Sequence, residues 1–145
     1  MNSNKRTLFT SKTYSGSRFS LVFLLALTTL TTGRSLAHMF LPDGGASSIA
    51  GIDVGVEGGN NIIAIFGQWG YSQLLLAGFM WVVLLSQRNL VPVALLFQAL
   101  DWGGRILVGL IKPVEVADAP PGEIGSYILF PMCVIALWLS LPKKS

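Results

Sequence analysis

The chain has 145 residues, of which 52% are hydrophobic and only 12% are charged, and its mean hydropathy is +0.62. Soluble domains carry about 25% charged residues, so this composition excludes a soluble globular protein. The net charge of +3 comes from basic residues that are neither clustered nor interleaved with aromatic residues, which argues against a nucleic-acid partner. The lipid bilayer is therefore the first partner we expect.

Residues 1–18 are rich in Ser, Thr, Asn and Lys, and we expect a disordered cytoplasmic tail there. The first apolar run, residues 19–41, is long enough to cross about 30 Å of hydrocarbon. A secretory signal peptide covering residues 1–37 is the alternative, because Ser35-Leu36-Ala37 before His38 resembles a cleavage site. Arg34 lies three residues before that site, which favours an uncleaved span.

The second, third and fourth apolar runs cover residues 62–86, 90–111 and 124–141, and Pro131 should kink the last one. The loop at 42–61 carries six glycines, and we expect a short interfacial helix there, lying across the mouth of the bundle. The sequence thus predicts an all-α integral membrane four-helix bundle, with its transmembrane domain over residues 19–141.

The basic residues outside the spans predict the orientation of the bundle. Seven of the ten would lie on one side of the membrane, whereas the loops at 42–61 and 112–123 contain six acidic residues and one lysine. Because cytoplasmic loops are enriched in Lys and Arg, we expect both termini in the cytoplasm. The seven are Lys5, Arg6, Lys12, Arg18, Arg88, Lys143 and Lys144.

The third span contains two ionisable residues, Asp101 and Arg105, at the i, i+4 spacing that allows an ion pair. Asp101 lies roughly 15 Å from the outer end of its helix, close to the bilayer midplane. Gln98 and Trp102 share that helix face. Charged groups at this depth cost several kcal/mol and often mark functional sites, although a purely structural ion pair or a proton relay fits the same pattern.

The other spans also carry polar residues in their outer halves. Arg34 shares a face with Thr31 and His38, Gln68 shares one with Asn61 and Ser72, and Glu123 precedes the fourth span. We predict that these groups line one outward-facing polar pocket, although interhelical hydrogen bonding without any ligand explains them as well. The candidate ligand-binding or ion-pair residues are Asp101, Arg105, Gln98, Arg34, Gln68 and Glu123.

Catalytic, metal and cofactor sites find little support in the sequence. The chain has one histidine and one cysteine, Cys133, which cannot form a metal site without widely separated carboxylates. Cys133 lies in the inner half of the fourth span, with no histidine near that level to activate it. We therefore predict no catalytic residue, no bound metal and no cofactor.

Several motifs resemble a family of small four-span bacterial membrane proteins of unknown function, similar in general shape to the DoxX-like group. The resemblance covers about residues 19–141. It implies a multi-pass protein of the bacterial inner (plasma) membrane and no established activity. Its motifs are Leu41-Pro42, the Gly-rich segment from Asn61 to Gly78, Asp101-Trp102-Gly103-Gly104-Arg105, Gly109 and Glu123.

The sequence favours a non-enzymatic protein that binds a small amphipathic ligand or a partner helix through the polar pocket. A proton or solute transporter that uses Asp101 is one alternative, and a membrane subunit assisting lipid or quinone oxidoreduction is another. The inner halves of the second and third spans are apolar, which argues against a path across the membrane. A second copy of the chain is a further candidate partner.

Overall fold

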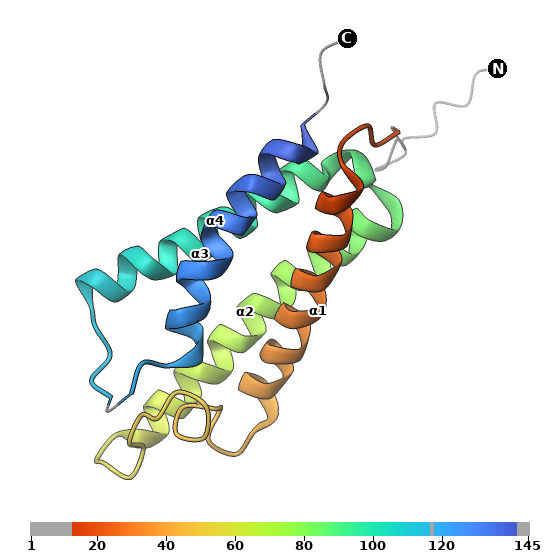
Figure 1. Cartoon of the computed structure of the whole chain (residues 1–145). Helices are drawn as coiled ribbons and strands as arrows, with labels where there is room; N and C mark the ends of the chain where they lie inside the picture. The colour runs from red at the N-terminus through yellow and green to blue at the C-terminus, as the bar shows by residue number, and fades with distance from the viewer. Residues whose placement is uncertain (1–12, 117, 142–145) are drawn as a thin grey trace, which may run out of the picture.

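The computed structural model describes residues 13–116 and 118–141 as an all-helical protein (Figure 1). The long helices are α1 (Arg18–Phe40), α2 (Gly59–Ser86), α3 (Val91–Ile111) and α4 (Pro121–Ser140), and a short 3-10 helix, η1 (Arg88–Leu90), precedes α3. Each long helix is long and apolar enough to span a membrane. The predicted all-α membrane bundle is therefore confirmed, and each helix begins and ends within three residues of a predicted span.

The helices form two hairpins, because α1 packs mainly against α2 and α3 packs mainly against α4. The start of α1 lies beside the end of α4, as Figure 1 shows. There the Ser17 N–H donates a hydrogen bond to the Leu139 carbonyl at 3.0 Å, and the Ser20 hydroxyl donates one to the Ala136 carbonyl at 2.7 Å. The first and last helices therefore place their chain ends at the same end of the bundle.

The predicted cytoplasmic tail falls mostly outside the described residues, which begin at residue 13. Ser17 is the N-cap of α1, and its hydroxyl accepts a hydrogen bond from the Phe19 N–H at 3.1 Å. Tyr14 packs against the buried apolar side chains and donates a hydrogen bond to the Ser17 carbonyl. This part of the segment is thus fixed against the helices.

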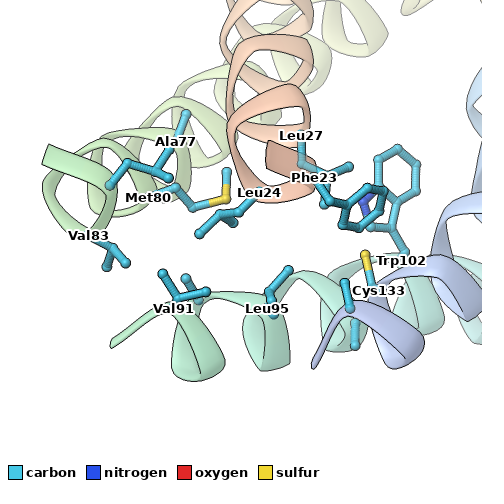
Figure 2. Packing of buried hydrophobic residues seen from close by; sticks show 14 residues of the cluster. Phe23, Leu24, Leu27, Ala77, Met80, Val83, Val91, Leu95, Trp102 and Cys133 are labelled. Atoms are coloured by element: carbon cyan, nitrogen blue, oxygen red, sulfur yellow. The ribbon is translucent and has the colours of Figure 1, made fainter. Parts of the chain in front are cut away.

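An apolar cluster joins the two hairpins and extends from the end where η1 links them to Trp102 at the middle of α3 (Figure 2). Its largest fully buried side chains are Leu24 and Leu27 from α1, Met80 from α2 and Leu95 from α3. Most other apolar side chains face outward. For example, Leu110 and Trp138 are both 72% exposed. An outer surface this apolar suits contact with lipid, as a membrane bundle requires.

The prediction of an interfacial helix in the loop between α1 and α2 is wrong. Residues 41–50 and 55–58 form turns and bends, and the first turns are organised by the Asp43 carboxylate. It accepts hydrogen bonds from the backbone N–H groups of Gly45, Ser47 and Ser48, at 2.6 to 3.1 Å. The bonds from Ser48 and Gly45 lower the pKa of Asp43 to about 2. Such local side-chain bonds compete with helix formation, and Gly44 and Gly45 adopt positive φ angles that a helix does not allow.

Gly70 brings α1 and α2 into close contact. A methyl group added at its Cα would lie 2.7 Å from the His38 Cβ and 2.9 Å from the Ser35 carbonyl oxygen. By contrast, nothing lies within 4 Å of the same position at Gly78, also on α2. Gly70 therefore fixes which face of α2 is turned toward α1.

Candidate functional site

Charged, amide and indole side chains from three helices meet between the two hairpins, and we call this group the Arg–Trp cluster. Asp101 lies at the middle of α3, ten residues from either end of the helix. This position puts the cluster near half the depth of a spanned bilayer. Its members are Arg34 from α1, Trp69 and Gln73 from α2, and Asp101, Trp102 and Arg105 from α3.

Asp101 and Arg105 form the ion pair that their spacing predicts. The Arg105 Nε and Nη2 both donate to Asp101 Oδ2 at 3.0 Å, and Nη2 also lies 3.3 Å from Oδ1. Bidentate geometry of this kind fixes the planes of both groups. The side chains are 16% and 19% exposed for Arg105 and Asp101, respectively, so the pair is mostly but not completely shielded.

A glutamine connects this pair to the third charged residue. The Arg34 Nη2 donates to the Gln73 Oε1 at 3.0 Å, and the Gln73 Nε2 donates to the Asp101 Oδ1 at 3.2 Å. The amide is a suitable bridge because it has both an acceptor and a donor. The resulting chain of hydrogen bonds runs from α1 through α2 to α3 and connects the two hairpins.

Two indole rings complete the cluster. The Arg34 Cζ lies 5.2 Å from the centroid of the Trp69 ring and 5.1 Å from that of Trp102. The Arg105 Cζ lies 4.7 Å and 4.9 Å from the same two centroids. All four distances are within the cation–π range. Because they share both rings, the two guanidinium groups are near neighbours.

The charges of the cluster do not balance. It contains two guanidinium groups, which stay protonated in proteins, and the carboxylate of Asp101. The buried Nε of Arg34 has no hydrogen-bond partner among the described residues. The Nη1 groups of both arginines likewise donate no hydrogen bond there, and both side chains are only partly buried. The site therefore has one surplus positive charge and accessible N–H donors.

Gln98 is fully buried one turn before Trp102. Its Oε1 accepts a hydrogen bond from the Trp102 indole Nε1 at 3.2 Å, whereas its own Nε2 has no partner among the described residues. The bond fixes the orientation of the indole ring that both arginines contact. Gln98 is thus a positioning residue next to the cluster.

His38 lies beside the cluster and connects it to the outer loop. Its Nδ1 lies 2.7 Å from the Gly44 carbonyl oxygen, and its ring packs 4.8 Å from the Trp69 ring and 5.5 Å from the Phe66 ring, centroid to centroid. The side chain is buried. Because a carbonyl oxygen can only accept, the Nδ1 carries the proton in this contact. His38 therefore supports Trp69 from the loop side.

The structure does not bring two of the predicted site residues to the cluster. Gln68 is exposed, as are Asn61 and Ser72, with which it was expected to share the buried face of α2. Glu123 is exposed in the first turn of α4. The face of α2 that is buried contains Gly70 and Gln73, together with Ala77 and Met80.

Gln73 and Trp69 are members of the cluster that the sequence did not predict. The signal available was the spacing Gly70, Gln73, Ala77, since a stripe of small residues marks the face of a membrane helix that packs closely. Gln73 is the polar residue on that stripe. Trp69 lies four residues before Gln73 and therefore on the same side of α2.

No group of three His, Cys, Asp or Glu side chains within the described ranges is arranged to hold a metal ion. A cavity of about 220 Å³ lies between the loop after α1 and the segment before α4, but no predicted site residue lines it. Its lining residues are Ile49, Ala50, Gly51, Asp118, Ala119, Pro120 and Pro121.

Comparison with known proteins gives no relative. No protein-family model matches the chain, and neither the curated proteins nor the solved structures include a match.

Proposed function

We propose that this protein binds a small amphipathic ligand at the Arg–Trp cluster, near half the depth of the membrane. The observation that carries the proposal is the gathering of Arg34, Asp101 and Arg105 between the hairpins. Each charged side chain costs about 2.5 to 3.5 kcal/mol to insert at the centre of a membrane helix. Interhelical hydrogen bonds in membranes contribute only about 0.6 kcal/mol each on average, so stabilising the bundle is a weak reason to keep three charges there.

The partial exposure of the ion pair supports binding. At 16% and 19% exposure, the side chains of Arg105 and Asp101 are reachable without unfolding the bundle. At the other end, the apolar cluster fills the space between the hairpins with Leu24, Met80 and Leu95. This arrangement favours a one-sided binding site over a path for protons or solutes across the membrane.

Native mass spectrometry of the gently solubilised protein tests the proposal. We expect the wild type to carry a co-purifying small molecule that the double variant Asp101→Asn, Arg105→Gln loses. The matched control is Arg88→Gln, because Arg88 is an exposed arginine whose Nε donates only to the Leu84 carbonyl. An adduct of equal occupancy in the double variant would contradict the proposal, as would an empty wild type. A bound protein in place of a small molecule would identify a partner helix.

We also propose that the bundle lies in a bacterial plasma membrane with both termini in the cytoplasm, as the resemblance to the DoxX-like group and the charge distribution suggest. Cysteine introduced at the exposed Ser47, in the loop between α1 and α2, tests the orientation. We expect an impermeant thiol reagent to label it in intact cells. The buried Cys133 of the unmodified chain provides the unlabelled background. Labelling only after lysis would reverse the orientation.

Intact mass measurement tests whether α1 is retained. We expect residues 1–37 to be present in the mature protein, because α1 supplies Leu24 and Leu27 to the apolar cluster and Arg34 to the Arg–Trp cluster. A mature protein that starts at His38 would contradict this and establish a signal peptide.

A further inference from the structure

We infer that the ligand of the Arg–Trp cluster presents an anionic head group, a carboxylate or a phosphate ester, to Arg34 and Arg105. The inference rests on the proposed function and specifies the chemistry of the ligand. It follows from the charge of the cluster, from the hydrogen-bond donors that remain accessible and from the surface of α3 beside them.

Asp101 does not neutralise both arginines. Its carboxylate already accepts hydrogen bonds from the Arg105 Nε and Nη2 and from the Gln73 Nε2, so its negative charge compensates Arg105 first. Arg34 reaches Asp101 only through Gln73. Charged groups inside a membrane are almost always paired, and the surplus charge of Arg34 lacks such a partner within the described residues. An anion at this position would supply the missing charge.

The donors fit the same chemistry. Both arginines are partly buried and have an Nη1 that donates no hydrogen bond among the described residues, and both guanidinium groups lie against the same two indole rings. Arginine N–H groups form strong, directional hydrogen bonds with carboxylate and phosphate oxygens. The aromatic rings hold the guanidinium planes in place, so a ligand would find the donors already oriented. A cationic head group would instead be repelled by two arginines, and a neutral one would leave the charge unbalanced.

The surface of α3 next to the ion pair can accommodate the apolar part of such a ligand. Nothing lies within 4 Å of a Cβ built on Gly104, which adjoins Arg105. The neighbouring positions on the same face of the helix, Leu100, Leu107 and Val108, are 57% to 62% exposed. A ligand that arrives from the bilayer can therefore place its chain on this apolar face while its head group reaches the arginines.

The experiment compares ligands that share one twelve-carbon chain and differ in head group. Delipidated wild-type protein in a neutral detergent is titrated with dodecyl phosphate, laurate, dodecanol and dodecyltrimethylammonium, and tryptophan fluorescence gives the apparent Kd. We expect the two anions to bind at least about 10-fold more tightly than dodecanol, because a hydrogen bond to a charged group is worth about that factor or more. Inorganic phosphate is titrated in parallel.

Two arginine variants separate charge from shape. Arg34→Gln should remove most of the preference for the anions, whereas Arg34→Lys should weaken binding and keep the preference, because it retains the charge but not the planar fork. Arg88→Gln should change nothing. The head-group series on the wild type is an independent measurement, because it needs no variant.

Each outcome bears on the inference. Equal affinity for dodecanol and the anions, or binding of none of the probes, would overturn it. A co-purifying molecule that the double variant loses would still support the proposed function in either case. Binding of inorganic phosphate as tight as that of dodecyl phosphate would support the anion chemistry and assign the ligand to a soluble source. Binding only of the chain-bearing anions would assign it to a lipid-like source.

Discussion

Two regions join the hairpins of this protein, and they differ in what they leave unsatisfied. In the apolar cluster near η1, the hairpins contact each other through Leu24, Met80 and Leu95. These side chains are fully buried and need no partner beyond close packing. The Arg–Trp cluster joins the same hairpins through hydrogen bonds and an ion pair, yet among the described residues it retains a surplus positive charge and a buried Arg34 Nε without an acceptor.

This difference supports the proposal that the apolar cluster is the contact that holds the hairpins together. A bundle that needed the Arg–Trp cluster only for cohesion would gain as much from apolar side chains of the same volume, because buried ion pairs are often no more stabilising than such replacements. Under the proposed function, the apolar cluster is the structural contact and the Arg–Trp cluster binds the ligand.

The largest effect is expected when the ion pair loses its acid. Asp101→Asn leaves two neighbouring guanidinium groups without a carboxylate, and we expect a loss of about 3 kcal/mol in the free energy of unfolding. The double variant Asp101→Asn, Arg105→Gln should lose less, since it removes the uncompensated partner as well. Unfolding in mixed detergent micelles measures both. Losses that simply add in the double variant would refute the pairing.

A cavity in the apolar cluster should have the next largest effect. Leu95→Ala removes a fully buried side chain, and we expect a loss of about 2 kcal/mol from the packing contacts that disappear. Leu96→Ala is the matched control on the same helix, because Leu96 is 44% exposed. We expect Leu96→Ala to lose less than about 0.5 kcal/mol in the free energy of unfolding. Equal losses at the two positions would mean that this region does not hold the hairpins together.

The close contact of α1 and α2 gives a prediction of intermediate size. Gly70→Ala places a methyl group against the Ser35 carbonyl and the His38 side chain, and we expect it to cost about 1 to 2 kcal/mol. Gly78→Ala, in open space on the same helix, should be neutral or stabilising, because alanine is the better helix former. The same unfolding assay measures both variants. A neutral Gly70→Ala would contradict the assigned face of α2.

How far the sequence predicts the site depends on the helix concerned. Asp101 and Arg105 were predictable, because both lie on one helix and a fixed spacing decides whether they meet. Arg34 was predictable from its depth in the membrane. The spans themselves follow from length and hydropathy alone, since about 20 apolar residues cross a bilayer.

Gln73 and Trp69 were not identified, because their position depends on the rotation of α2 about its own axis. Most of α2 is apolar on every side, so its sequence pattern shows only weakly which face is buried. The choice between the Gln68 face and the Gln73 face is made by contact with α1 at Gly70. The turn at Asp43 was missed for a related reason, since its hydrogen bonds depend on backbone groups two to five residues further along the chain.

Gln73 offers a smaller test of the bridge between the hairpins. Gln73→Leu removes the hydrogen bonds to Arg34 and Asp101, and we expect a loss of about 1 kcal/mol, given typical values in membranes. Gln68→Leu makes the same chemical change on the exposed face of α2 and should cost nothing measurable. Similar stability of the two variants would indicate that Gln73 does not couple the hairpins.

The smallest effect concerns the outer loop. Because the folded protein holds the pKa of Asp43 at about 2, below its ordinary value of 3.8, ionised Asp43 stabilises the turn above pH 4. This contribution is lost as the pH falls toward 2, where the carboxylate becomes protonated. We expect a small additional acid sensitivity in the wild type that Asp43→Asn lacks, measured by unfolding between pH 5 and pH 2. Identical pH profiles would contradict it.

The stability of Arg34→Gln in delipidated protein shows whether Arg34 is retained for a ligand. If Arg34 is retained for a ligand, removing it relieves a surplus charge that offsets its contacts with Gln73 and the indole rings. The free energy of unfolding should then stay within about 1 kcal/mol of the wild type or rise. A loss as large as that of Asp101→Asn would show that Arg34 holds the bundle together, and would contradict its assignment to a ligand.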